Sequence, residues 1–298
     1  MSALAHEVLG LLSNPALIAV TDKHHGLGNR IRAVLGARIL ARAEGRAFAY
    51  TWPVGKMFGA AFSELWDFQE PLVSTAISRL VSPCFPYKDN KLLWLNAAAR
   101  AQRVWQIRTA HALLLPPDCT PWEQELRALS PAEAVRSSIQ SAFADGPSGV
   151  PFIGVMIRTN SNAHQETLKH SPLEWYLHRM REIRQWWPEV PFYVSADTPE
   201  AFAEVQKHFS HTHGNANKGP YNSKPALSSS VVDVYMLAAA THVLGPHYSS
   251  FPELAQRLAG PELRLETSQT PTATRLTDRT GLSTPADPLV PYVRSRLG

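Results

Sequence analysis

Hydrophobic residues in the second half of the chain form short runs that alternate with stretches of helical periodicity. The first run, 152–157 (FIGVMI), is apolar at nearly every position, which is typical of a strand buried on both faces of a parallel sheet. The pattern predicts strands at 151–158, 190–196, 242–245 and 262–266, and helices at 171–187, 199–209, 229–240 and 250–259. Ser171, with proline next and Glu174 after it, has the spacing of a capping box. This alternation predicts a doubly wound parallel sheet.

The first half opens with a similar unit. An apolar strand at 16–21 is followed by a turn with Gly26 and Gly28, a helix with apolar residues between Ile31 and Leu40, and a second strand at 46–52. The pattern is weaker afterwards, where we expect a helix at 58–68, strands at 91–95 and 112–115, and a helix at 131–145. The turn 146–149 (GPSG) predicts a linker, which divides the chain into domains 1–149 and 150–298. Threonine and proline density beyond Thr267 predicts an extended tail.

Composition fits a cytoplasmic globular protein. With 298 residues, 44% hydrophobic and 18% charged, the chain can form two α/β domains with separate cores. The formal charge of +4 is compatible with a site for anionic ligands. The sequence contains no block of Lys or Arg, so the charge does not indicate a nucleic-acid partner. The cysteines Cys84 and Cys119 form no CxxC pair, which favours a reducing compartment. Asn14 and Pro15 interrupt the N-terminal apolar run, so we expect no integral membrane segment.

Three loops at predicted strand ends carry candidate chemistry. Arg158 ends its strand abruptly, at the sheet edge where open α/β sheets bind ligands, and a guanidinium suits bidentate recognition of phosphate. The segment 247–251 (HYSSF) leads into a helix whose start would offer N–H groups and hydroxyls to phosphate. The third loop is the glycine turn with Asn29. A surface arginine, a serine N-cap and a tight packing turn are the ordinary alternatives.

Four segments, in this order and spacing, resemble the fucosyltransferase superfamily: GLGNRIRAVLGA, VMIRTN, YVSADTPE and VVDVYMLAAATHVLGPHYSSFPELAQRLAG. The resemblance is loose over 16–52 and more specific over 151–260. It implies a GT-B fold, in which two Rossmann-like domains with parallel sheets face each other across a cleft. It also implies inverting transfer from GDP-fucose without a metal, with the donor bound by the C-terminal domain and the acceptor by the N-terminal domain.

The resemblance assigns expected roles to individual residues. Arg158 matches the arginine of the HxR motif, which holds the donor pyrophosphate, and Asp197 resembles an aspartate near the guanine. The remaining expected donor contacts are Gly28, Asn29, His247, Tyr248, Ser249, Ser250 and Phe251. Met156 departs from the pattern at the motif histidine, and Thr159 stands where the α1,6 enzymes have a second arginine, which leaves the nucleotide open.

Glu166 lies close to where the α1,6 enzymes carry a catalytic carboxylate, so the resemblance implies that it acts with Arg158 in catalysis. A solvated loop carboxylate is the alternative interpretation. Substitute bases are His24, His25 and His164. The histidines of KHFSHTHG have no accompanying carboxylate or cysteine cluster, so we expect no metal site there.

These observations predict a metal-independent glycosyltransferase that uses a GDP-sugar, with fucose as the expected sugar, as co-substrate and no other cofactor. Its partners would be the nucleotide sugar and a glycan or glycoconjugate acceptor. The alternative is a nucleotide-sugar binding protein without turnover. A nicotinamide-dependent oxidoreductase would need GxGxxG, but Ile31 stands where the third glycine belongs.

Overall fold

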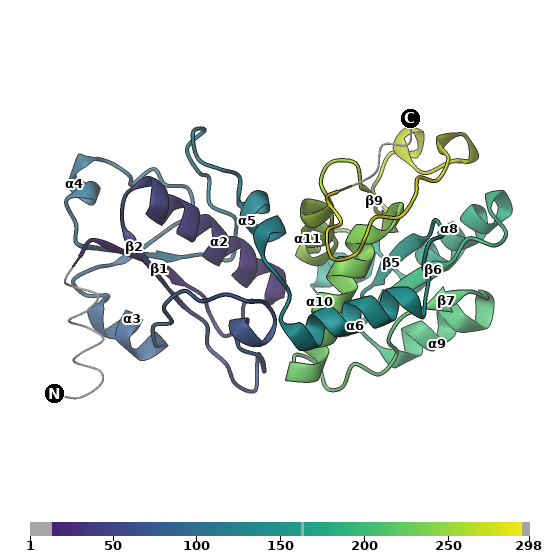
Figure 1. The fold of residues 1–298 in the computed structure, drawn as a ribbon, viewed down its shortest axis with the longest axis horizontal. Coiled ribbons are helices and arrows are strands. Elements are labelled where there is room, and N and C mark those ends of the chain that lie inside the picture. Colours follow the sequence, from purple (N-terminus) through teal and green to yellow (C-terminus); the bar gives the residue numbers. More distant parts are fainter. Residues whose placement is uncertain (1–13, 162–163, 294–298) are drawn as a thin grey trace. The chain divides into compact units, whose positions relative to one another are not determined.

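The computed structural model describes residues 14–161 and 164–293, which form two compact units (Figure 1). Unit 1 contains the chain up to Ser130 and residues 222–224; unit 2 contains 131–221 and 225–298. The segment 222–224 joins unit 1 because Gly59 N–H donates to Asn222 O and Lys224 pairs with Glu64 at 2.6 Å. The boundary lies before helix α6 (Glu133–Ala144), earlier than the linker predicted at 146–149, because α6 belongs to unit 2.

Unit 1 is a parallel sheet with strand order β2-β1-β4-β3. The central strand β1 (Ala16–Val20) is buried at every position, and α2 (Leu27–Ala43) connects it to β2 (Ala47–Thr51) as predicted. The other elements are η1 (Phe62–Glu64), α3 (Thr75–Val81), β3 (Tyr87–Lys88), α4 (Ala97–Arg100), β4 (Val104–Arg108) and α5 (Trp122–Ala128). The helices α2 and α3 cover opposite faces of this sheet (Figure 1).

Three predictions between residues 53 and 130 are wrong. The helix predicted at 58–68 is reduced to the 3₁₀ turn η1, and the segments 91–95 and 112–115 are not strands. The apolar spacing of 58–68 instead serves an aromatic stack, in which Phe62 lies 4.6 Å from Trp52 and 4.3 Å from Phe68 between ring centroids. The strands β3 and β4 occupy the two positions that complete the sheet.

Unit 2 is a second parallel sheet, with strand order β7-β6-β5-β8-β9. The predicted strands correspond to β5 (Ile153–Ile157), β6 (Phe192–Ala196), β8 (His242–Leu244) and β9 (Arg264–Glu266); the short β7 (Thr212–His213) was not predicted. Its helices after α6 are α7 (Gln165–His170), α8 (Leu173–Trp186), α9 (Pro199–His208), α10 (Lys224–Ala239) and α11 (Ser250–Ala259). The predicted α/β fold class is confirmed by the two parallel sheets.

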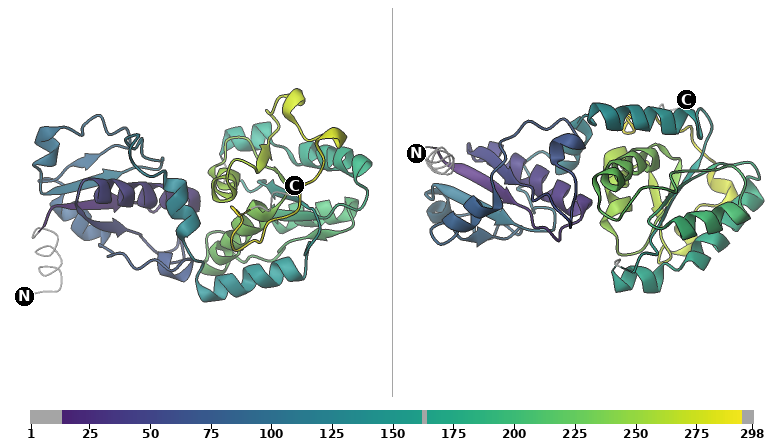
Figure 2. Two further views of the ribbon diagram at one scale, coloured as in Figure 1. Left: turned by 45° about the horizontal axis from the view of Figure 1, so that its top comes forward. Right: turned by 90° about the horizontal axis from the view of Figure 1, so that it is seen from below.

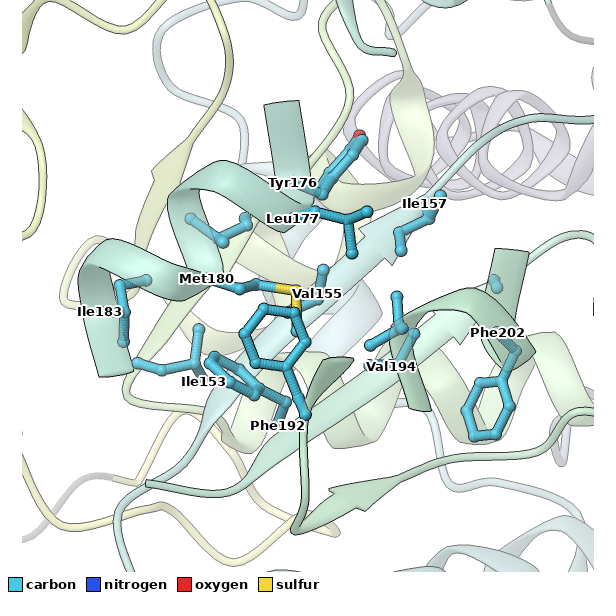
Figure 3. Packing of buried hydrophobic residues seen from close by; sticks show 14 of the residues in the cluster. Ile153, Val155, Ile157, Tyr176, Leu177, Met180, Ile183, Phe192, Val194 and Phe202 are labelled. Carbon is cyan, nitrogen blue, oxygen red and sulfur yellow. The ribbon is translucent and has the colours of Figure 1, made fainter. Parts of the chain in front are cut away.

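The core of unit 2 lies on both faces of β5. Ile153, Val155 and Ile157 point toward α8 and α9, where they pack with buried residues of those helices and of β6 (Figure 3). On the other face, a Cβ at Gly154 would meet Leu237 of α10 at 2.8 Å, so glycine permits the helix to approach the strand closely. Burial on both faces explains why the sequence of β5 is apolar throughout.

The chain beyond β9 runs over unit 2 as an extended tail with two 3₁₀ turns, η2 (Thr272–Thr274) and η3 (Asp278–Thr280) (Figure 2). Buried Glu266 accepts from Leu276 N–H and from the Arg179 guanidinium, while Arg179 also donates to Leu276 O. Although burial opposes the charge, hydrogen bonds from His242 and Arg179 lower the pKa of Glu266 to about 2. The backbone of Leu276 therefore fastens the tail to the buried ion pair between Arg179 of α8 and Glu266 of β9.

The order of strands in unit 2 reverses between β5 and β8. The chain proceeds from β5 outward to β6 and β7 on one side, and from β8 to β9 on the other. Ligands in doubly wound sheets bind at the carboxyl ends of the strands where such a reversal occurs. This point lies between the loops that follow Ile157 and Leu244.

In the described part of the chain, no helix has the length and apolar character needed to cross a membrane.

Candidate functional site

Arg158 follows the last residue of β5, as predicted, and its side chain is about a quarter exposed. Its Nη1 lies 3.6 Å from Oδ2 of Asp197, which follows β6. The other carboxylate oxygen, Oδ1, accepts from the backbone N–H of Thr159 at 2.8 Å and of Asn160 at 3.2 Å. Asp197 therefore holds both the arginine and the loop after it. The predicted position of Asp197 near the guanine of the donor is not tested by these contacts.

The turn after β8 presents the start of α11 at the same sheet edge. Ser249 is the N-cap and its Oγ accepts from Phe251 N–H at 3.4 Å, so Ser250 is the first helical residue, at the start of the helix predicted at 250–259. Tyr248 is 63% exposed and has a φ of 60°, a left-handed conformation that a tyrosine rarely adopts. The helix start therefore offers backbone N–H groups and two hydroxyls to an anion.

Helix α7 packs directly on this turn. Thr167 Oγ1 donates to Tyr248 O at 3.0 Å, and His247 N–H donates to Ser171 Oγ at 2.8 Å. The His164 ring lies 4.5 Å from that of Tyr248 between centroids. The predicted capping box at Ser171 is wrong, because Pro172 is the N-cap of α8 and Ser171 holds the turn instead. The sequence gives no signal for this contact, which joins residues 76 positions apart.

Glu166 lies in α7, on this side of unit 2, and has a histidine partner. Its Oε2 is 3.1 Å from Nε2 of His170, and the two side chains are 48% and 31% exposed. The His170 ring meets that of His247 edge-on, with 5.6 Å between centroids. Residues 162 and 163 of the connecting loop lie outside the described residues. Sequence reasoning singled out Glu166 but missed His170, although the four-residue spacing on a helix was a usable signal.

Unit 2 thus brings together most of the predicted site residues: Arg158, Glu166, Asp197, His247, Tyr248, Ser249, Ser250 and Phe251. A guanidinium and a helix start can neutralise a diphosphate, and a carboxylate and imidazole nearby can accept a proton. Beneath them, burial, reinforced by the Asp197 carboxylate, raises the pKa of the Tyr176 hydroxyl, which therefore stays protonated. The arrangement suits chemistry on a phosphate ester.

A buried network beside β6 was not predicted. Asp233 of α10 is 1% exposed and accepts from Tyr193 at 2.9 Å, from Ser195 at 2.7 Å and from the Lys218 ammonium. Burial, with the neighbouring carboxylate, raises the pKa of Tyr193. Lys218 belongs to the polar loop 214–221, whose sequence shows no periodicity. The ion pair between Lys218 and Asp233 therefore fastens the loop to the core, and no sequence pattern indicated this contact.

Gly28 and Asn29 lie in unit 1, in the first turn of α2, where Asn29 Oδ1 accepts from Arg32 at 2.7 Å. The next residue, Arg30, is fully buried, and its guanidinium donates to His25 O at 2.9 Å and to Pro53 O at 3.0 Å. The guanidinium carbon lies 3.8 Å from the centroid of the Phe58 ring. Burial lowers its pKa to about 10. This arginine fixes the glycine turn from inside unit 1.

The predicted substitute base His25 accepts from Asp22 N–H at 3.2 Å through Nδ1. Burial lowers its pKa, against the raising effect of Asp22, so the ring is neutral at neutral pH. The neighbouring residue His24 is exposed, and its backbone N–H donates to Asp22 Oδ1.

Solved structures with a similar architecture include fucosyltransferases. NodZ α-1,6-fucosyltransferase co-crystallised with GDP aligns over 82% of this chain and 92% of its own, with 17% identity and a TM-score of 0.56. NodZ from Bradyrhizobium aligns over 82% and 93%, with 18% identity and a TM-score of 0.53. POFUT1 in complex with GDP-fucose aligns over 86% and 99%, with 12% identity and a TM-score of 0.53. The chain has the GT-B fold of these fucosyltransferases.

The predicted resemblance is confirmed at the level of the fold, over more than four-fifths of the chain. No protein-family model matches the sequence, and no curated protein does. At 11% to 18% identity, the likeness shows a common architecture and leaves the reaction to be argued from the site.

Proposed function

We propose that the protein is a glycosyltransferase that transfers a sugar from a GDP-sugar, with fucose as the expected sugar, to a glycan or glycoconjugate acceptor. The observation that carries the proposal is that Arg158 and the start of α11 follow the carboxyl ends of the neighbouring strands β5 and β8, where the strand order reverses. The solved structures of the same fold include complexes with GDP and with GDP-fucose.

The proposed site neutralises the leaving group with protein charge. Arg158 binds the diphosphate through its planar fork, and the N–H groups and hydroxyls of Ser249 and Ser250 bind the same oxygens. As the bond from the sugar to the diphosphate breaks, these groups stabilise the developing charge. The transfer therefore needs no metal ion. In the proposed transfer the acceptor oxygen attacks opposite the leaving diphosphate, so the configuration at the anomeric carbon is inverted.

A panel of nucleotide sugars and nucleoside diphosphates, tested by thermal shift, examines the proposal. GDP and GDP-fucose should raise the melting temperature, whereas UDP and CMP compounds should not, because a ligand stabilises only the state that binds it. Release of GDP on incubation with GDP-fucose should accompany the shift. Stabilisation by UDP-sugars alone would refute the choice of nucleotide.

A binding protein without turnover is the second candidate, and one observation favours it. Met156 stands where the superfamily has its motif histidine, and its side chain is buried in β5, so it presents no polar group to a ligand. Such a binder would show GDP-dependent stabilisation without releasing GDP from any GDP-sugar.

A further inference from the structure

Glu166 and His170 form a pair in which each partner has a defined role. A carboxylate only accepts hydrogen bonds, so the contact of 3.1 Å requires Nε2 of His170 to carry the proton. The Nδ1 lone pair of that tautomer is then left to accept another proton. In carboxylate and histidine pairs of this kind, the carboxylate orients the ring and stabilises the imidazolium, while the ring takes the proton.

The pair alone is not distinctive. Helix α9 carries Glu204 and His208 with the same spacing and direction, 3.2 Å apart. What distinguishes the α7 pair is its surroundings: α7 binds the turn before α11 through Thr167, and the His170 ring lies against His247, two residues before the N-cap Ser249. The imidazole of His170 is therefore part of the assembly that presents the start of α11.

We propose that His170 is the general base of the transfer and that Glu166 is the carboxylate that orients it; the inference rests on the proposed function. The acceptor hydroxyl gives its proton to Nδ1 of His170 as its oxygen bonds to the anomeric carbon. The bond from that carbon to the diphosphate breaks, and its electron pair leaves with GDP. His170 then releases the proton to solvent.

The chemistry favours the ring over the carboxylate. A carboxylate in water ordinarily titrates near pH 4 and an imidazole near pH 6.5, so the imidazole is the stronger base when both are deprotonated at neutral pH. Nearly half of the Glu166 side chain is exposed to water. The facing turn places the His247 ring against that of His170, and Lys169 is the other basic residue in the last turn of α7.

The test compares H170A, H170Q and E166Q with H208Q, which removes the matched histidine on α9. Both His170 variants should lower kcat about 10²- to 10⁴-fold and leave GDP affinity and the melting temperature unchanged. Free imidazole should restore part of the rate to H170A but not to E166Q, in which the histidine is still present. H208Q should behave as wild type.

Two results would overturn the inference while the proposed function stands. The first is that the His170 variants transfer the sugar at the wild-type rate. The second is that E166Q has a far lower kcat than H170A and imidazole does not rescue H170A, which would make Glu166 the base. A wild-type protein that binds GDP but turns over no GDP-sugar would refute the proposed transfer and the inference together.

Discussion

Replacing Arg158 with lysine tests whether the arginine binds phosphate through its fork. The side chain is about a quarter exposed, at the end of β5, so lysine keeps the charge without disturbing the core. A single ammonium cannot reproduce two parallel hydrogen bonds, and one charged hydrogen bond contributes about 1.5–3 kcal/mol. GDP affinity should therefore fall about 10- to 100-fold in R158K.

The same change should have little effect on folding. The contact to Asp197 is long, at 3.6 Å, and the amides of Thr159 and Asn160 continue to hold that carboxylate, so the stability should change by less than about 1 kcal/mol. Titration calorimetry with GDP measures the affinity, and thermal unfolding measures the stability. R136K, on the exposed face of α6, is the matched control. Wild-type affinity in R158K would show that Arg158 is only a surface charge.

Three further predictions concern the diphosphate site and the buried Glu266. GDP should raise the melting temperature equally with EDTA and with Mg²⁺, because Arg158 and the start of α11 neutralise the diphosphate; a shift that requires metal would contradict this. S249A should lose the cap of α11, which costs about 0.5–1 kcal/mol in urea unfolding, and should weaken GDP binding as well. Glu266 has a lowered pKa, so up to about 3 kcal/mol of stability, present above pH 4.5, should be lost as the pH falls toward 2. E266Q should abolish this acid limb and destabilise the protein at pH 7 by about 1.5–3 kcal/mol, because buried Arg179 is left with only the partly exposed Glu182 as an ionic partner; an unchanged limb would refute the assignment.

The sequence predicted the central strands of unit 2 well because β5 and β6 are buried at every position. Their sequences are therefore mostly apolar, and in β5 Gly154 and Arg158 mark where a helix approaches and where the strand ends. Prediction failed in residues 53–130 because aromatic packing, as between Phe62 and Trp52, produces apolar spacing without regular structure. Strand β3 has only two residues, and Gln106 and Arg108 interrupt the apolar run of β4, so neither has the continuous apolar sequence that identified β5.

The sequence placed the candidate site residues at the ends of strands and helices, but it did not indicate the residues that contact them. Arg158 and Ser249 stand at strand and helix ends that the pattern places. The contacts that hold them, such as Ser171 to His247 and Lys218 to Asp233, join distant segments through side chains of ordinary type. No periodicity or local motif records such contacts, because they depend on how the loops pack.

The most direct test of the central claim is the release of GDP from GDP-fucose by the purified protein, with EDTA present, in wild type and in R158K. The proposed transferase should release GDP, slowly to water and faster once a suitable glycan is added, and R158K should do so at least about tenfold more slowly. Binding of GDP-fucose with no release of GDP, with or without glycan acceptors, would contradict the claim.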